Sequence, residues 1–243
     1  MERWETLREG GFHLLTEGAS PLGTDAFLLS AFPRLRAGER ACDLCGGTGA
    51  VGLLLLQRRP DLSVTAVELR EEAVRLAERT AAANGLEGRL TVRHGDLREI
   101  RRLLPAGSFD LVTCDPPYFR PDSGALPADP GRRTARTETG CTLTDVCAAA
   151  AWLLRWGGRL CLVHRPERLA DLLCALRAAG LEPKRLRIVC KAAGAAPSLL
   201  LLEGRRGGRP GLRWEEPLIL AGPDGAPTAE LDRIYFRGEG DAM

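Results

Sequence analysis

Residues 43–49 read Asp-Leu-Cys-Gly-Gly-Thr-Gly, and this stretch decides how the rest of the chain is interpreted. A strand-like segment, residues 39–45, leads into it, and a helix-like segment, residues 49–59, follows. Gly47 and Gly49 allow the tight turn and the close backbone approach to a ligand that join a strand to a helix in nucleotide-binding folds. The stretch therefore predicts a strand, a ligand-binding turn and a helix.

Outward from this turn, strand-like and helix-like segments alternate. The predicted strands cover residues 39–45, 63–69, 90–96, 109–115, 159–164, 185–190 and 198–203, and the predicted helices cover residues 49–59, 70–84, 144–156 and 166–179. We expect Gly157 and Gly158 to stop the third helix. Alternation favours a parallel sheet with helices on both faces, and two consecutive final strands favour an antiparallel hairpin at one edge. We predict a single Rossmann-like α/β domain, residues 1–243, with a seven-stranded, mostly parallel sheet.

Composition narrows the class of protein. The chain has 243 residues, a net charge of +2, 44% hydrophobic residues and 27% charged residues, which is ordinary for a soluble globular domain. The nearly balanced charge neither requires nor excludes a nucleic-acid partner, so any basic surface must be local. We find neither a signal peptide nor an apolar run long enough to span a membrane, and we expect a cytoplasmic protein.

Eight cysteines raise the question of a metal site or disulfides. Cys42 and Cys45 have redox or zinc spacing, but no second pair follows at a zinc-ribbon interval. Five cysteines stand in strand-like apolar runs, and Cys147 and Cys174 stand in helix-like ones. We expect no metal and interpret these residues as small buried hydrophobes.

Carboxylates end three successive predicted strands, beside the glycine turn. The candidate cofactor-binding residues are Asp43, Gly46, Gly47, Gly49, Glu68 and Asp96. Parallel strands bring their carboxyl ends to one crevice. There Asp43 would repel a pyrophosphate but suits the cationic amino-acid part of S-adenosylmethionine. Glu68, about 20 residues after the turn, can accept both ribose hydroxyl bonds, and Asp96 can reach the adenine amine. We predict an S-adenosylmethionine site.

The fourth predicted strand ends in Asp115-Pro116-Pro117-Tyr118, and this motif carries the chemistry. The exocyclic amine of a base is a poor nucleophile because its lone pair is delocalised into the ring. The Asp115 carboxylate and the Pro116 carbonyl can accept the two amino hydrogens and favour a tetrahedral nitrogen, and the prolines fix these acceptors. Tyr118 offers a π face for stacking the base. We predict methyl transfer to an exocyclic amine, with Asp115 also beside the cofactor.

Further motifs extend from about residue 20 to the C-terminus. They are Gly23-Thr24-Asp25-Ala26 with Leu28-Leu29, the 43–49 turn, Asp115-Pro116-Pro117-Tyr118-Phe119, Ala135-Arg136-Thr137-Glu138, Leu162-Val163-His164-Arg165-Pro166, Glu182-Pro183-Lys184-Arg185, and Glu203-Gly204 with Gly207-Gly208-Arg209-Pro210. With these motifs the chain resembles the bacterial tRNA1(Val) adenine-37 N6-methyltransferases, which are class I methyltransferases with an Asn/Asp-Pro-Pro-Tyr motif. It departs from the usual family pattern at Asp115, where Asn is usual, and at Thr137, where His is frequent.

The resemblance implies a partner and a division of the chain. The partner is tRNA, and the target adenine lies in a single-stranded loop beside the anticodon, where a base is easily splayed out. Residues 1–38 would cover the cofactor, with Thr24 and Asp25 in contact with it. Residues 116–141 would form a substrate loop that includes Phe119, and residues 204–243 a C-terminal extension. Whether the protein is a monomer or a homodimer stays open.

Basic residues suggest where the RNA backbone would bind. Arg132, Arg133 and Arg136 follow the catalytic motif and are expected to grip tRNA phosphates. A second group near the last two strands could extend this surface: Lys184, Arg185, Arg187, Arg205, Arg206 and Arg209.

Three alternatives use parts of the same pattern. A protein glutamine N5-methyltransferase shares the Pro-Pro-Tyr chemistry, but that class carries an N-terminal helical domain for which the segment before Gly23 is too short. A DNA adenine methyltransferase needs a target-recognition domain, for which residues 116–141 are too short. A non-catalytic S-adenosylmethionine- and RNA-binding module would not need the intact motif at residues 115–118.

Overall fold

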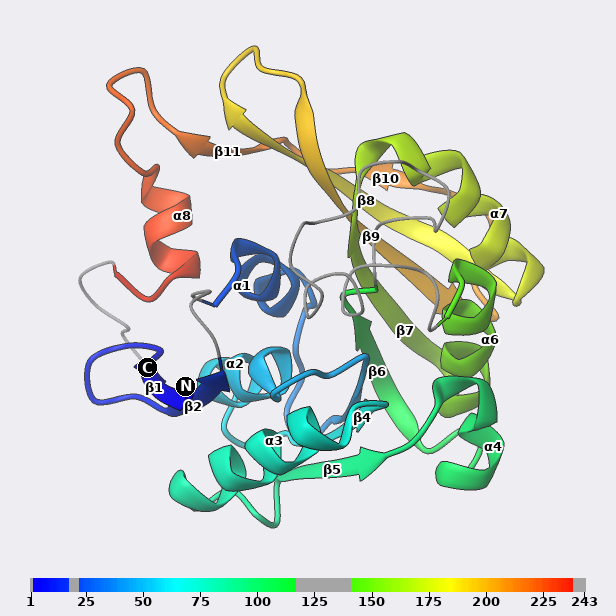
Figure 1. The fold of residues 1–243 in the computed structure, drawn as a ribbon. Helices are drawn as coiled ribbons and strands as arrows, with labels where there is room; N and C mark the ends of the chain where they lie inside the picture. Colours follow the sequence, from blue (N-terminus) through cyan, green and yellow to red (C-terminus); the bar gives the residue numbers. More distant parts are fainter. Residues whose placement is uncertain (1, 18–21, 117–140, 238–243) are drawn as a thin grey trace, which may run out of the picture.

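The computed structural model describes residues 2–17, 22–116 and 141–237 (Figure 1). One sheet of nine strands organises them, in the order β10-β8-β9-β7-β6-β3-β4-β5, with β11 also paired to β8. The strands are β3 (Arg40–Leu44), β4 (Ser63–Glu68), β5 (Leu90–His94), β6 (Phe109–Cys114), β7 (Leu154–His164), β8 (Leu181–Ala192), β9 (Pro197–Arg206), β10 (Arg213–Trp214) and β11 (Leu218–Ala221). Within this sheet only β9 runs antiparallel to its neighbours, β7 and β8.

The predicted Rossmann-like arrangement is confirmed. All seven predicted strands are present, and the β8–β9 hairpin lies on the side of the sheet away from β5. Strand β9 lies between β7 and β8. After β7 the chain therefore forms β8 one strand position further out, and then returns to fill the gap with β9. Two short strands that the sequence pattern did not indicate, β10 and β11, pair with β8 outside this hairpin.

Helices cover both faces of the sheet (Figure 1). The helical segments are α1 (Thr24–Ala31), α2 (Ala50–Arg58), α3 (Glu71–Ala83), η1 (Leu97–Glu99), α4 (Ile100–Leu103), α6 (Leu143–Leu153), η2 (Pro166–Arg168), α7 (Leu169–Ala178) and α8 (Ala229–Ile234). Two apolar clusters follow from this layering: α1 and α2 bury their apolar residues on one face of the sheet, and α6 and α7 on the other.

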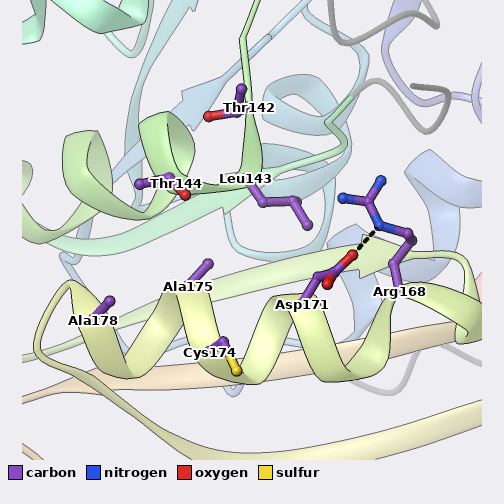
Figure 2. A pocket seen from close by; sticks show the side chains of 8 residues that line it. All are labelled: Thr142, Leu143, Thr144, Arg168, Asp171, Cys174, Ala175 and Ala178. Atoms are coloured by element: carbon purple, nitrogen blue, oxygen red, sulfur yellow. Dashed lines mark hydrogen bonds and ion pairs between the residues drawn. The ribbon is translucent and has the colours of Figure 1, made fainter. Parts of the chain in front are cut away.

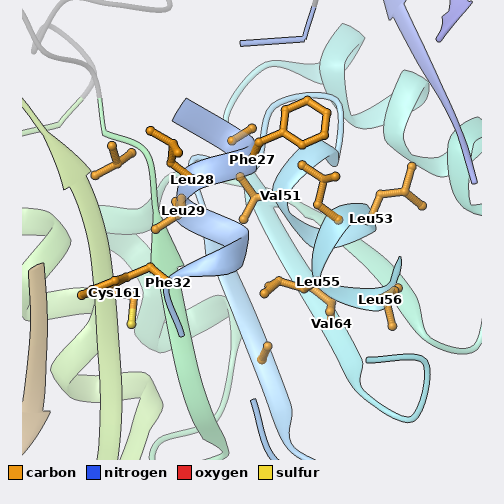
Figure 3. Close-up of a cluster of buried hydrophobic side chains, with 14 of the residues drawn as sticks. Phe27, Leu28, Leu29, Phe32, Val51, Leu53, Leu55, Leu56, Val64 and Cys161 are labelled. Carbon is orange, nitrogen blue, oxygen red and sulfur yellow. The ribbon is translucent and has the colours of Figure 1, made fainter. Parts of the chain in front are cut away.

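The cluster under α1 and α2 fixes the elements that lead into the glycine turn. Figure 3 shows Phe27 and Leu29 of α1, with Phe32 just after that helix, in one cluster with Val51 and Leu55 of α2, and all five are buried. Burying one such side chain contributes roughly 1.5–3 kcal/mol. The start of α2, where the turn ends, is therefore held firmly against the sheet.

The junction of α6 and β7 corrects a sequence expectation. Helix α6 ends at Leu153 and β7 begins at Leu154, so residues 154–156 are extended rather than helical. Gly157 and Gly158 do not stop a helix; they lie inside β7 at an irregularity of its pairing with β6. Gly157 has a φ of 80°, and a Cβ on Gly158 would lie 2.9 Å from a backbone oxygen. Glycines in a strand are typical of such bulges.

An N-terminal hairpin precedes α1. Strands β1 (Glu2–Thr6) and β2 (His13–Glu17) pair with each other and dock on α3, where the N–H of Leu15 donates to Thr80 Oγ1 at 3.0 Å. Glu5 Oε2 accepts the N–H of Leu22 at 3.0 Å. The hairpin is thereby tied to the residues that lead into α1.

Candidate active site

Parallel strands bring the sequence-predicted residues to one edge of the sheet. The register sets Leu44 beside Cys114 and Glu68 beside His94, so β3, β4, β5 and β6 end together. The predicted residues at or just beyond these ends are Asp43, Glu68, Asp96 and Asp115. We call this the catalytic edge. Carboxyl ends of parallel strands are where α/β sheets bind their ligands.

The turn after β3 exposes backbone at this edge. Cys45, Gly47 and Gly49 have φ of 58°, 55° and 86°, in the left-handed region that favours glycine. The N–H of Gly46 donates to a β4 carbonyl, and a Cβ on Gly46 would lie 2.8 Å from Ala66 Cβ. Gly46 is therefore required for close packing against β4, and the turn leaves room for a ligand to approach the main chain.

Asp43 is a buried carboxylate with one of its oxygens satisfied. The residue is 1% exposed, and its Oδ1 accepts the Thr113 hydroxyl at 2.6 Å. Oδ2 has no hydrogen-bond partner among the described residues and lies 3.4 Å from the place that a Cβ on Gly46 would take. Burial raises the pKa of Asp43 to about 7, and the charges of Asp115 and Glu68 also raise it. A cationic ligand would donate a hydrogen bond to the unsatisfied oxygen and balance the charge of the carboxylate.

The other two strand-end carboxylates accept bonds from their own chain. Glu68, 6% exposed, accepts the N–H of Gly47 at 2.9 Å, and the N–H and Nε of Arg70 at 2.9 and 3.1 Å. Asp96 accepts the N–H of Arg98 at 2.9 Å and its Nε at 2.8 Å, and the bonds with this guanidinium lower the pKa of Asp96. A nucleoside that binds these carboxylates must share them with Arg70 and Arg98 or displace the two guanidinium groups.

The predicted catalytic motif begins directly after β6. Asp115 is partly buried and Pro116 is buried. Because Asp115 follows Cys114, which pairs with Leu44 of β3, the start of the motif adjoins the strand-end carboxylates. The remaining predicted catalytic and substrate-binding residues lie outside the described residues: Pro117, Tyr118, Phe119, Arg132, Arg133 and Arg136.

Three cysteines, Cys45, Cys114 and Cys141, lie between the ends of β3 and β6 and the start of α6. Cys45 Sγ is 4.0 Å from Cys141 Sγ, and a hydrogen bond with Cys114 raises the pKa of Cys45. Burial raises the pKa of Cys114 to about 11. The raised pKa values of Cys45 and Cys114 favour the protonated thiols at neutral pH, which makes them poor nucleophiles. Within residues 2–17, 22–116 and 141–237, no cluster of three or more metal-ligating side chains occurs. One expectation was wrong: Cys174 is exposed on α7.

A pocket of about 410 Å³ lies between the start of α6 and α7 (Figure 2). Its lining consists of Thr142, Leu143, Thr144, Arg168, Asp171, Cys174, Ala175 and Ala178. At one end of this lining, Arg168 Nε donates to Asp171 Oδ2 at 2.6 Å (Figure 2). None of the sequence-predicted site residues lines this pocket. Nearby, burial lowers the pKa of His164 to about 4, so this histidine at the end of β7 is neutral.

Thr24 and Asp25 form the first turn of α1, after Gly23. The hydroxyl of Tyr235, just after α8, donates to Thr24 Oγ1 at 2.8 Å, and the Tyr235 ring stacks on Phe27 with centroids 4.2 Å apart. The C-terminal segment therefore holds the start of α1, an interaction that no sequence pattern indicated.

Two arginines expected at an RNA-binding surface are already paired inside the protein. Arg185 is buried and donates to Glu203 Oε2 at 2.8 Å and to Glu215 Oε1 at 2.9 Å. Arg187 donates to Glu230 Oε1 at 2.7 Å. Burial removes Arg185 from any RNA-binding surface, which corrects that expectation, whereas Arg187 stays partly exposed with its charge paired by Glu230.

Comparison with known sequences places the chain among methyltransferases. The family described as the methyltransferase small domain matches residues 22–173. A Tolumonas auensis protein named tRNA1(Val) (adenine(37)-N6)-methyltransferase is 33% identical over 226 residues, which are 90% of this chain and 91% of the relative. A Bordetella pertussis protein named ribosomal protein uL3 glutamine methyltransferase is 38% identical over 161 residues, which are 64% of this chain and 50% of the relative.

Solved structures share the fold. A protein of Agrobacterium tumefaciens described as a predicted O-methyltransferase superposes with a TM-score of 0.70 and 22% identity, covering 88% of this chain and 97% of the other. Geranyl diphosphate C-methyltransferase of Streptomyces coelicolor, solved with S-adenosyl-L-homocysteine, gives a TM-score of 0.55 and 12% identity, covering 74% and 79%. Among the described helices, none has the length and apolar character needed to cross a membrane.

Proposed function

The chain belongs to the methyltransferase small-domain family and, within it, to the tRNA1(Val) (adenine(37)-N6)-methyltransferases, and from this we propose that it methylates the exocyclic N6 of an adenine in tRNA. Membership makes the chain a methyltransferase enzyme. The favoured base is adenine 37, beside the anticodon. One observation carries the proposal: a relative of this name matches 90% of the chain, including the segment with Asp115 and Pro116. A tRNA substrate implies a cytoplasmic enzyme.

The residues at the catalytic edge fit S-adenosylmethionine. The unsatisfied Oδ2 of Asp43 suits a cationic amino group, and the open space at Gly47 leaves room for a ligand to approach the adjoining turn. Glu68 and Asp96 are placed at neighbouring strand ends, where they can accept bonds from ribose hydroxyls and an adenine amine. When bound, the cofactor supplies an electrophilic methyl group.

The start of the catalytic motif supports activation of an amine. The Asp115 carboxylate and the Pro116 carbonyl would accept the two amino hydrogens of the base and so favour a nucleophilic, tetrahedral nitrogen. Tyr118 would stack on the target base and set its distance from the methyl group. The nitrogen that gains the methyl group must shed one proton, and Asp115 would already be hydrogen-bonded to that N–H.

A glutamine side-chain amide is the second candidate substrate. The Bordetella pertussis relative favours it, although this chain spans only half of that enzyme's length. An amide nitrogen presents the same problem as a base amine, because its lone pair is also delocalised. The same two acceptors would serve it.

A transfer experiment distinguishes the two substrate classes. The purified protein is incubated with S-adenosylmethionine labelled in the methyl group and with a mixture of undermodified tRNA and ribosomal proteins. The proposal predicts label in the tRNA fraction. Label confined to protein would replace the proposal by the glutamine alternative, and heat-denatured enzyme provides the background.

A further inference from the structure

Two tryptophans, Trp156 near the start of β7 and Trp214 in the edge strand β10, are the most exposed large hydrophobic residues that the structure describes. Trp156 is 78% exposed and Trp214 is 62% exposed, whereas Trp4 and Leu69 are just under half exposed. A single exposed aromatic residue is ordinary. Two exposed tryptophans among basic residues suit a partner that has flat rings or sugars and also carries negative charge.

Interactions in the described chain make the surface between these tryptophans continuous. The Trp156 ring lies over Gly207, where a Cβ would come within 2.3 Å of it. The segment after β9 then folds along β8, where Lys184 Nζ donates to the Arg209 carbonyl at 2.9 Å. Figure 1 shows this orange segment beside β8, on the side of the sheet away from β5. The outer-edge surface, as we call it, comprises Trp156, Lys184, Arg205, Arg209, Arg213 and Trp214. It wraps around the edge of the sheet, because Arg213 and Trp214 are consecutive in β10 and extend to opposite faces.

The charge of this surface is not neutralised within the described part of the chain. None of its four cationic side chains forms an ion pair there. Of three nearby carboxylates two are engaged elsewhere, and the third, the exposed Glu216, reduces the positive charge beside Trp214. Glu182 pairs with Arg177 at 3.2 Å, and Glu215 pairs with Arg185 at 2.9 Å. The surface therefore attracts anions, although the net charge of the whole chain is only +2.

Strand register fixes where this surface lies relative to the catalytic edge. Cys114, the residue before Asp115, lies beside Leu162 of β7, and the same row continues through Leu202 and Leu186 to Trp214. Four strand spacings of about 4.8 Å separate Cys114 from Trp214, or roughly 19 Å. The row points to the face covered by α6 and α7, where its first four members are buried. Trp214 emerges beyond these helices.

We propose that the outer-edge surface binds the sugar-phosphate backbone of the RNA substrate, away from the base that is methylated. This inference rests on the proposed function and adds a second RNA-binding region to it. The four cations would neutralise phosphates, and the tryptophans would pack on riboses or unpaired bases. A separation of roughly 19 Å suits an RNA that presents its loop to the catalytic edge while its adjoining stem lies along the sheet.

The test measures binding of undermodified tRNA as a function of salt concentration. In the triple variant Lys184→Ala, Arg209→Ala and Arg213→Ala, we expect the log–log salt slope to flatten by about 0.9 for each phosphate that is no longer neutralised, hence by about 2–3. The matched control replaces Arg75, Arg89 and Arg93 by Ala on the β5 side of the sheet, where the slope should stay at the wild-type value. Affinity for S-adenosylmethionine reports that each variant is folded.

Tryptophan substitutions give an independent readout. Trp214→Ala should weaken tRNA binding about 5- to 100-fold at fixed salt, and Trp214→Phe should restore most of the affinity, because a ring suffices for stacking. A triple variant with the wild-type salt slope would overturn the proposal. So would a wild-type dimer that Trp214→Ala converts to a monomer, since the surface would then join two copies. If the wild-type protein binds no tRNA at all, the proposed function itself fails.

Discussion

Asp43 is an ionisable side chain at 1% exposure with one donor among the described residues, Thr113, for its two oxygens. Its pKa in the folded protein, about 7, lies above the ordinary value of 3.8. The folded state therefore binds more protons than the unfolded state between about pH 4 and 7, and the free energy of unfolding must fall as pH rises through that window. Full ionisation costs on the order of 4 kcal/mol.

Asp43→Asn should separate stability from binding. The amide keeps an oxygen for Thr113 but does not ionise, so we expect the variant to be more stable than wild type at pH 8 by up to about 4 kcal/mol, with little difference near pH 4. S-adenosylmethionine should bind more weakly, because the cation loses its counter-charge. Denaturant unfolding at both pH values and calorimetry measure the two effects. A stability difference independent of pH would show that Asp43 ionises normally.

Asp115 tests the chemistry. Asp115→Ala should lower kcat by at least roughly 10²-fold and leave cofactor affinity nearly unchanged, because the carboxylate acts mainly on the transition state. Asp115→Asn is the matched control: it retains an acceptor oxygen, and Asn is usual at this position in the family that the chain resembles, so activity should largely persist. Single-turnover rates with saturating cofactor distinguish the two. An alanine variant that turns over at the wild-type rate would refute amine activation by Asp115.

Sequence reasoning reached these carboxylates because each ends a recognisable strand. It did not reach Thr113, because its place beside Asp43 follows from β3 pairing with β6, two strands that are far apart in the chain. Nor were two hydrogen bonds predictable, from the guanidinium of Arg70 to Glu68 and from that of Arg98 to Asp96. Local sequence gives a residue's place on its strand, whereas side-chain partners depend on pairing and rotamers.

Helix α8 and the residues just after it hold α1 and α2 through a few specific interactions. Arg58 of α2 donates to the Ile234 carbonyl at 2.6 Å, and its guanidinium lies 4.5 Å from the centre of the Phe236 ring. Tyr235 stacks on Phe27 and bonds Thr24. The C-terminal segment thus stabilises the helix that carries two predicted cofactor-binding residues.

Two substitutions of Tyr235 separate the contribution of its hydrogen bond to Thr24 from that of its ring stacking on Phe27. Tyr235→Phe removes only the bond to Thr24 and should lower the free energy of unfolding by about 0.5–1.5 kcal/mol. Tyr235→Ala also removes the stacked ring, and we expect a destabilisation of roughly 1–3 kcal/mol. Thermal unfolding of both variants gives the comparison. Equal stabilities for the alanine variant and wild type would mean that α8 does not hold α1.

Elements with strong periodicity were predictable, and those defined by their partners were not. Strand 63–69 and helix 70–84 lie within a residue or two of β4 and α3. Residues 154–156 appeared helical because they continue the apolar pattern of α6, yet pairing with β6 makes them extended. The two-residue strand β10 exists only because β8 offers it an edge.

At the scale of the whole molecule, the sheet connects the two proposed RNA-facing regions. Its parallel strands place the carboxylates at the catalytic edge, and the β8–β9 hairpin with β10 displaces the outer-edge surface sideways from it. The net charge of +2 does not show how the charges are distributed. Some arginines, such as Arg185, are in ion pairs, whereas the outer-edge cations form no ion pair in the described part of the chain. A global charge therefore says little about binding, whereas its distribution predicts salt-dependent association.

The central claim, transfer of a methyl group to N6 of a tRNA adenine, is tested most directly by the chemistry of the product. Undermodified tRNA is treated with enzyme and labelled S-adenosylmethionine, digested to nucleosides and separated by chromatography with mass detection. We predict that the label appears in N6-methyladenosine and that Asp115→Ala abolishes it. Label in another methylated nucleoside, or none in RNA while protein is labelled, would contradict it.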